Sequence, residues 1–276
     1  GDVYKRQHRA EFDEADIEMF ETFGALIAVT LIRLESHRLA IADAEFHQQM
    51  EMAHEIQGSF LPPNRAHLGS FVLSALYVPA AETGGDFYFW HALDDGKILL
   101  GVGDVCGKGF PAALDMARGS TMIASLSHRA GRMPLNEWVD ELNHRLYDVM
   151  NDGRFICTTF ALIDQKAQTV SWCLCGSVPP KRLESGTWKD LTISANPPLG
   201  ISPAISYASD TLTCLPGSRW LVLTDGILET QNDSGIYFED EAFEISLAKI
   251  AHALDPVERL AADWQAFSSN STYRDD

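Results

Sequence analysis

Three aspartates share a local setting that suits them to chemistry on phosphate groups. Asp86 follows a pair of glycines, whereas Asp104 and Asp225 each end an apolar run and adjoin a glycine. A carboxylate at a strand end beside glycine projects into a loop that a ligand can approach closely. Mg²⁺ and Mn²⁺ prefer such oxygen ligands, and converging carboxylates repel one another unless cations neutralise them. Any one of the three alone fits an ordinary turn, but together they predict a divalent metal site.

The net charge of the chain restricts its partners. The 276 residues carry a formal net charge of -18, which argues against binding to nucleic acid or to an anionic membrane. A metal-dependent nuclease would use similar cation chemistry but conflicts with this charge. An acidic protein that acts on phosphates must supply positive charge locally, and bound divalent cations would do so.

Cysteine usage and hydropathy add two further expectations. The five cysteines are odd in number and lack paired CxxC spacing, so a zinc site or a disulfide framework is disfavoured; Cys106, beside Asp104, is expected to be a packing residue. No apolar stretch reaches the roughly 18 residues of a membrane span, and the first residues do not form a signal peptide. We therefore expect a cytoplasmic protein with no membrane span in this segment.

A long helix is predicted before the aspartates, over residues 11 to about 60, ending at Pro62-Pro63 because proline cannot continue a helix. Apolar residues recur there at three- and four-residue spacings, as in Phe20, Phe23, Ile27, Leu31 and Leu34. Asp43 and Gln57 interrupt a heptad seam, so we expect a weak helix pair that forms a homodimer and can switch between two arrangements. The residues expected to act as a regulatory helix are Ala53, Glu55, Ile56 and Gln57. A passive linker helix is the open alternative.

The remainder of the chain alternates between strand and helix patterns. Strands are predicted at Phe71–Val78, Lys97–Val102, Thr158–Asp164, Thr169–Cys175 and Trp220–Thr224. The third and fourth of these, joined by the short polar link Gln165–Gln168, are predicted to form an antiparallel hairpin. Helices are predicted at Ala112–Leu126, Leu135–Met150, Asp240–Leu254 and Pro256–Phe267, the last capped by Asp255. Antiparallel strands with helices in separate blocks indicate an α+β domain and not a doubly wound parallel sheet.

Several short motifs now fall into a recognisable order. From about residue 50 to the end, the chain resembles the SpoIIE/RsbU-type branch of the PPM (type 2C) metal-dependent serine/threonine protein phosphatases. The matching segments are Ala53–Gln57 with Leu61-Pro62-Pro63, Gly84–Tyr88, Gly103–Gly109 with Pro111–Leu114, Pro198–Gly200, Leu223–Gly226 and Arg274–Asp276. Each motif is weak alone, whereas their order and spacing together are specific.

The resemblance implies a fold, a reaction and a site. The fold would be α+β, with two antiparallel β-sheets packed as a sandwich flanked by helices in α/β/β/α layers. The enzyme would be a protein-serine/threonine phosphatase, a phosphoric monoester hydrolase that uses two divalent ions, Mn²⁺ or Mg²⁺, to activate water. Asp86, Asp104 and Asp225 would be catalytic. The metal ligands would be those three aspartates, the Val105 carbonyl and Asp275, with Asp104 bridging both ions.

The same resemblance implies partners and a domain division. The substrate would be a phosphoserine or phosphothreonine on a bacterial signalling protein, of the STAS-type anti-sigma-factor antagonist class, so that the enzyme would take part in sigma-factor regulation. Residues 1–40 resemble the last helix of an upstream GAF-like sensor, residues 41–66 would be the connecting helix, and residues 67–276 the phosphatase domain, truncated at its C-terminal strand. A non-catalytic partner-binding module of the same fold is the alternative function.

Overall fold

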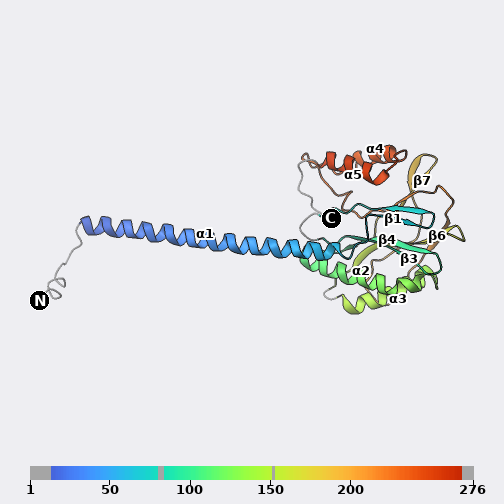
Figure 1. Ribbon diagram of the computed structural model, residues 1–276, viewed down its shortest axis with the longest axis horizontal. Helices are drawn as coiled ribbons and strands as arrows, with labels where there is room; N and C mark the ends of the chain where they lie inside the picture. The colour runs from blue at the N-terminus through green and yellow to red at the C-terminus, as the bar shows by residue number, and fades with distance from the viewer. Residues whose placement is uncertain (1–13, 80–83, 151–152, 269–276) are drawn as a thin grey trace. The chain divides into compact units, whose positions relative to one another are not determined.

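The computed structural model describes residues 14–79, 84–150 and 153–268 (Figure 1). The chain divides into two compact units, Gly1–Glu51 and Met52–Asp276. Helix α1, Glu14–Gly58, begins in the first unit and ends in the second. None of the helices within the described ranges has both the length and the hydropathy needed to cross a bilayer.

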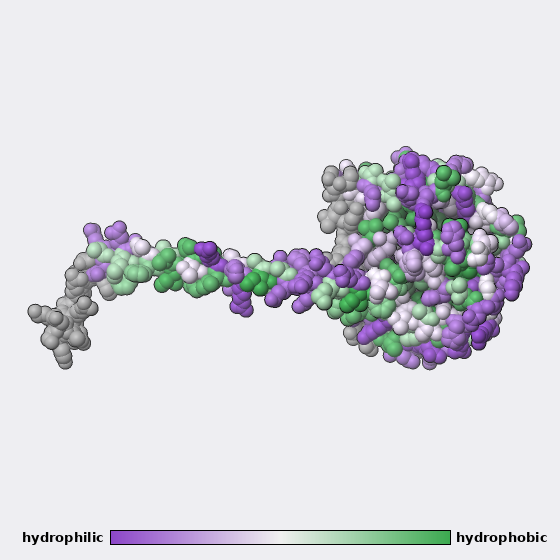
Figure 2. Space-filling view, viewed as in Figure 1, coloured by the Kyte–Doolittle hydropathy of each residue, from purple (hydrophilic) through white to green (hydrophobic). Residues whose placement is uncertain are grey.

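The described part of the first unit, residues 14–51, belongs to α1, and its large apolar side chains are exposed. The side chains predicted to line one face are all more than half exposed, namely Phe20, Phe23, Ile27, Leu31 and Leu34. Figure 2 shows hydrophobic side chains along the length of this helix. The predicted long helix is confirmed, and among the described residues of this unit its apolar side chains have no core to pack against.

Helix α1 ends in the second unit through a tightened last turn. The amides of Ser59, Phe60 and Leu61 donate to the carbonyls three residues earlier, at 3.1, 3.0 and 3.2 Å. Such bonds satisfy carbonyls that a helix end leaves without partners. The helix thus stops at Gly58, just before the proline pair that forbids its continuation.

The main sheet of the second unit has six strands, in the order β10-β6-β5-β4-β3, with β9 beside β6. All neighbours are antiparallel except the β6–β9 pair. The bounds are β3 Phe87–Ala92, β4 Ile98–Val105, β5 Ile156–Asp164, β6 Thr169–Cys175, β9 Ala195–Asn196 and β10 Asp210–Thr213. The predicted β5–β6 hairpin is confirmed, and β4 extends three residues past the predicted end at Val102.

Further strands pair in two smaller groups. Strands β1 (Arg65–Leu68) and β2 (Phe71–Ser74) form one hairpin, and β11 (Trp220–Leu221), β7 (Lys181–Glu184) and β8 (Thr187–Asp190) form a three-stranded sheet. Regular pairing therefore stops earlier than predicted in both β2 and β11. These groups pack on one face of the main sheet, where Trp220 lies 6.4 Å from both Trp172 of β6 and Phe71, between ring centroids.

Helices cover both outer faces of these strands (Figure 1). The predicted helices are confirmed within a few residues as α2 Phe110–Ala130, α3 Leu135–Val149, α4 Ala242–Ile250 and α5 Pro256–Phe267. Asp255 caps α5 as expected, because its side chain accepts a bond from the Glu258 amide at 3.0 Å. Helices α4 and α5 pack around Trp188 of β8.

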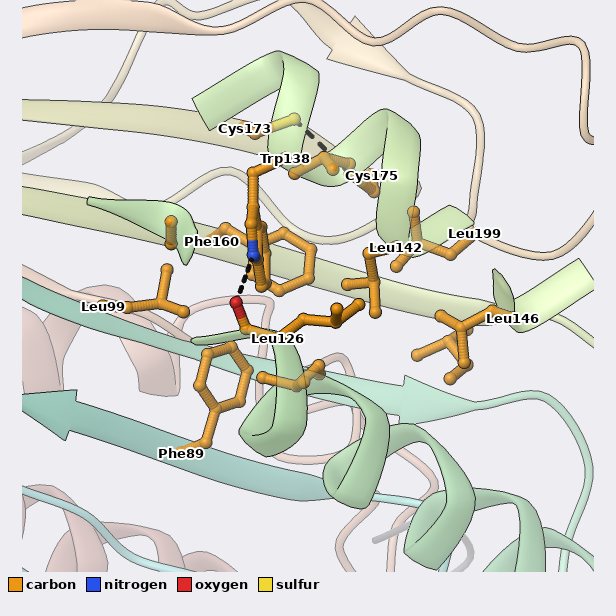
Figure 3. Close-up of a cluster of buried hydrophobic side chains, with 14 of the residues drawn as sticks. Phe89, Leu99, Leu126, Trp138, Leu142, Leu146, Phe160, Cys173, Cys175 and Leu199 are labelled. Carbon is orange, nitrogen blue, oxygen red and sulfur yellow. Dashed lines mark hydrogen bonds between the residues drawn. The ribbon is translucent and has the colours of Figure 1, made fainter. Parts of the chain in front are cut away.

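The largest core lies between the main sheet and helices α2 and α3. Alternate residues of β5 face opposite sides, so Phe160 and Leu162 belong to this core while Ala161 and Ile163 face the smaller sheets. Trp138 of α3 meets the Phe160 ring edge-on at 5.3 Å and donates to the Leu126 carbonyl of α2 at 2.9 Å (Figure 3). The α+β fold of layered antiparallel sheets and flanking helices is confirmed.

Candidate active site

Two of the predicted aspartates leave the same end of the main sheet. Asp104 is the penultimate residue of β4, and Asp86 immediately precedes β3. Strand β3 pairs with β4 so that Phe87 lies opposite Gly103. The antiparallel register therefore carries Asp86 and Asp104 toward each other at the sheet end.

Gly85 allows the chain before Asp86 to approach the end of β4 closely. Its carbonyl accepts a bond from the Val105 amide at 3.3 Å. A Cβ on Gly85 would lie 2.6 Å from the Val105 carbonyl oxygen and 3.3 Å from Asp104 Oδ1. Because real Cβ atoms do not approach backbone oxygens so closely, only glycine fits this position without displacing β4.

The third aspartate reaches the site from the segment after β11. Thr224 Oγ1 donates to Asp86 Oδ2 at 2.5 Å, which ties this segment to the start of β3. The Asp225 carbonyl accepts bonds from the amides of Leu228 and Glu229, both at 2.8 Å, so a tight turn follows the carboxylate. The structure thus brings Asp86 and Asp225 together through a bond that links distant parts of the sequence.

Asp104 and Asp225 line one small cavity of about 240 Å³. The other residues that line it are Cys157, Gly176, Ser177, Val178 and Thr224, so the described lining contains no lysine or arginine. Cys157 lies opposite Asp104 in the β4–β5 register. The walls of the cavity therefore offer carboxylate and main-chain oxygens without a side-chain cation.

The Cys157 thiol is influenced by the charges of all three carboxylates. Burial, and then the charges of Asp104, Asp225, Cys106 and Asp86, raise the pKa of the Cys157 thiol to about 12. Each negative charge raises this pKa because it opposes formation of a thiolate nearby. Asp86, Asp104 and Asp225 thus contribute to the same negative potential at the cavity.

This donor set fits a hard divalent cation. Mg²⁺ and Mn²⁺ in proteins are usually bound by carboxylate and main-chain carbonyl oxygens together with waters. The carboxylates at this sheet end and the adjacent Val105 carbonyl are oxygens of this kind, and the described lining of the cavity contains no basic side chain that would compete with a cation. Within the described ranges, no three His, Cys, Asp or Glu side chains are grouped closely enough to hold a metal by themselves. Asp275, the remaining predicted ligand, lies outside the described residues.

The predicted regulatory helix contributes one buried side chain. Of Ala53, Glu55, Ile56 and Gln57, only Gln57 is buried, at 4% exposure, whereas Ile56 is 60% exposed. The Gln57 amide bonds to both main-chain groups of Gly84. Helical periodicity could not have indicated this contact, because it pairs a helix residue with a loop 27 positions later.

One buried carboxylate of the second unit was not singled out from the sequence, and Cys106, which was, has defined contacts. Asp115 of α2 is buried at 2% exposure and forms ion pairs with Arg118 and Arg154, each at 2.8 Å. Cys106 exchanges bonds with Phe155, since its amide donates to the Phe155 carbonyl at 3.0 Å and its sulfur accepts from the Phe155 amide at 3.1 Å. The latter contacts agree with the packing role expected for Cys106.

Comparisons with known proteins identify relatives of this chain. It is similar to phosphoserine phosphatase RsbU of Bacillus subtilis, with 25% identity over 79% of this chain and 66% of that protein. It is also similar to phosphoserine phosphatase RsbP of the same organism, with 22% identity over 66% of this chain and 45% of that protein. The chain spans between 35% and 66% of the length of the curated relatives it matches.

A solved structure and a family profile agree with these relatives. The SiaA-PP2C domain of Pseudomonas aeruginosa has the same fold, with a TM-score of 0.69 at 22% identity over 86% of this chain and 95% of that one. The profile described as stage II sporulation protein E (SpoIIE) matches residues 94–276, which is more than half of the chain. The chain therefore belongs to the SpoIIE family, within the SpoIIE/RsbU-like PPM serine/threonine phosphatases.

Proposed function

We propose that this chain is a metal-dependent phosphatase that removes phosphate from phosphoserine or phosphothreonine on a partner protein. The observation that carries the proposal is the shared cavity of Asp104 and Asp225, two carboxylates delivered by different segments. Asp86 supports it, because Thr224 holds its carboxylate beside that cavity. If these aspartates had only structural roles, their proximity would be unexplained, because carboxylates that lie close together repel one another. That repulsion lowers the folding stability of the protein unless cations neutralise it.

Two divalent ions, Mn²⁺ or Mg²⁺, are the proposed cofactors. The ligands would be Asp86, Asp104, Asp225, the Val105 carbonyl and Asp275. When bound, such ions supply Lewis-acid chemistry that activates water and neutralises the charge of a phosphoryl group. The chain's own contribution is to hold the ligands in place: Thr224 orients Asp86, and Gly85 leaves room beside the Val105 carbonyl.

The proposed substrate is a phosphorylated signalling protein of the STAS type. The names of the RsbU and RsbP relatives support action on phosphoserine. The net charge of -18 favours a protein substrate over nucleic acid. We place this activity in residues 67–276, joined by residues 41–66 to a GAF-like sensor whose last helix would be residues 1–40.

The exposed apolar residues of α1 support the proposed homodimer. A helix with large apolar side chains along its length, such as Phe20, Phe23 and Leu31, is unfavourable in water unless another helix covers them. A second copy of this helix would provide a matching surface.

The proposed function is tested with p-nitrophenyl phosphate and a phosphoserine peptide. Hydrolysis of both is expected in Mn²⁺ or Mg²⁺, and its loss is expected in excess chelator. Binding of a phosphorylated STAS domain without any phosphate release, in either ion, would support the non-catalytic alternative and contradict the proposal.

A further inference from the structure

A short turn forms part of the wall of the small cavity but holds none of the proposed metal ligands. Gly176, Ser177 and Val178 follow directly after β6 and line this cavity together with Asp104 and Asp225. Ser177 is partly buried, so its side chain belongs to the wall and remains within reach of a ligand. The turn therefore borders the space in which a phosphoryl group would meet metal ions held by the two carboxylates.

The conformation of this turn is fixed by its surroundings. Gly176 has a φ of 68°, in the left-handed region that favours glycine, and a Cβ at this position would lie 2.4 Å from Cγ of Pro198. The Gly176 amide donates to the Asn196 carbonyl at 2.8 Å, and the Asn196 side chain donates to the Leu174 carbonyl at 3.0 Å. Ser177 is thus held at the cavity before a ligand arrives, which lowers the cost of ordering it on binding.

The wall contains two side-chain hydroxyls, and they differ in their hydrogen bonds. Thr224 donates its hydroxyl proton to Asp86. Within the described ranges, no hydrogen bond involves the Ser177 hydroxyl or the main-chain amides of Ser177 and Val178. These donors must therefore be satisfied by water or by a ligand in the cavity.

The other side chains of the wall are poorly suited to donate to a phosphoryl oxygen. Ionised Asp104 and Asp225 only accept hydrogen bonds, the Cys157 thiol is a weak donor, and the described wall has no lysine or arginine. A phosphate monoester carries its negative charge on non-bridging oxygens, and a hydroxyl that donates to such an oxygen forms a charge-assisted bond. Ser177 is therefore the side chain of the described wall best suited to contact the phosphoryl group itself.

We infer that Ser177 is a phosphate-binding residue of this site, whose hydroxyl donates to a non-bridging oxygen of the phosphoryl group in a phosphate monoester. It touches the substrate and not the metal ions, and it forms no covalent bond during the reaction. The same contact is available to inorganic phosphate, the product. This inference rests on the proposed function and deepens it, because it adds a neutral donor to a site otherwise made of carboxylates.

The test measures phosphate binding separately from metal binding, in the whole chain. Ser177→Ala removes the hydroxyl, and Ser177→Thr keeps it. Ser234→Ala is the matched control, because Ser234 is exposed in a loop and does not line the cavity. Isothermal titration calorimetry gives the Kd of Mg²⁺ and then the Kd of inorganic phosphate at saturating Mg²⁺. Hydrolysis of p-nitrophenyl phosphate gives kcat/KM, and thermal unfolding in chelator reports whether each variant folds.

Ser177→Ala is expected to raise the Kd of inorganic phosphate and to lower kcat/KM for the ester, each by roughly tenfold, as for the loss of a hydrogen bond to a charged group. Its Kd for Mg²⁺ is expected to match that of the wild type, because no proposed metal ligand is changed. Ser177→Thr is expected to keep most of the phosphate affinity, and Ser234→Ala to match the wild type in every measurement.

Unchanged phosphate affinity in a folded Ser177→Ala chain would overturn the inference. An equal loss in Ser177→Ala and Ser177→Thr would also overturn it, because the loss would not depend on the hydroxyl. A matching loss of Mg²⁺ affinity would assign Ser177 to the metal ions and overturn it as well. A wild-type chain that neither binds phosphate nor hydrolyses the ester would instead contradict the proposed function.

A measurement on the wild type decides the matter if the Ser177 variants do not fold. Inorganic phosphate added to the Mg²⁺-loaded chain is expected to shift the amide NMR signals of Ser177 and Val178, because the phosphoryl group binds against this turn. Bound phosphate that leaves these two signals unchanged would overturn the inference.

Discussion

Thr224 donates its hydroxyl proton to the Asp86 carboxylate across 2.5 Å, and this bond joins the segment after β11 to the residue that precedes β3. Hydrogen bonds to an ionised carboxylate are stronger than those between neutral groups. Thr224 also precedes Asp225, so a single contact fixes the positions of two of the three carboxylates relative to each other. We therefore expect the site to depend on this hydrogen bond between segments as well as on its acidic residues.

Replacing Thr224 by valine tests the cross-link, because valine keeps the shape and removes the donor. We expect metal-dependent hydrolysis to fall by roughly ten- to a hundredfold, since a bond to a charged group contributes about 1.5–3 kcal/mol. Thr187→Val, on an exposed position of β8, is the control and should keep wild-type activity. Equal kcat/KM values for the two variants at fixed Mn²⁺ would show that Asp86 needs no help from Thr224.

Gly85→Ala tests the close approach to β4. The added methyl would lie 2.6 Å from the Val105 carbonyl oxygen, so we expect the free energy of unfolding to fall by about 1–3 kcal/mol. Gly24→Ala is the matched control, because nothing lies within 4 Å of that position and alanine favours a helix. Urea denaturation measures both variants. A Gly85→Ala protein as stable as the wild type would mean that the two segments are not in contact.

Asp225→Asn tests the role of this carboxylate in turnover. We expect hydrolysis to fall by roughly a thousandfold or more, because cation-dependent stabilisation of the transition state is worth several kcal/mol. Stability in chelator should be unchanged or higher, since one charge is removed from a repelling cluster. Asp148→Asn, on an exposed position of α3, should change neither property. Near-normal turnover of Asp225→Asn would remove Asp225 from the proposed ligands.

Asp255→Ala tests the N-cap of α5. The Asp255 carboxylate accepts from the Glu258 amide at 3.0 Å, and losing such a cap costs about 1 kcal/mol. We expect a lower melting temperature with unchanged kcat/KM, because α5 packs against Trp188 and does not line the small cavity. A drop in turnover at full folding would show that α5 affects the site.

Local patterns in the sequence predicted much of the fold and part of the site. Apolar runs and turn residues located the β5–β6 hairpin and four helices within a few residues, because these elements depend on neighbouring residues. The setting of Asp86, Asp104 and Asp225 indicated a shared site. In the structure Asp104 and Asp225 line one cavity and Asp86 is bonded to Thr224, which lines it too, while their role as metal ligands stays a prediction. The end of β4 was placed too early, since pairing with β5 continues it to Val105.

Contacts between distant segments could not be predicted in this way. The Thr224–Asp86 and Gln57–Gly84 hydrogen bonds produce no periodic pattern in the sequence, because each depends on how separate elements pack. The heptad pattern suggested that Gln57 lies in a helical seam, whereas its side chain in the structure is bonded to Gly84. The GAF-like segment and the division into 1–40, 41–66 and 67–276 stay predictions.

The most direct test of the metal-dependent phosphatase proposal is phosphate release from a phosphoserine protein, measured together with the Mn²⁺ bound per chain. We expect the wild type to bind Mn²⁺ and release phosphate, and to stop doing so in excess chelator. Asp104→Asn should remain folded but lose both properties. Phosphate release that persists in chelator, or in a folded Asp104→Asn chain at near wild-type rate, would contradict the assignment of these carboxylates to a catalytic metal centre.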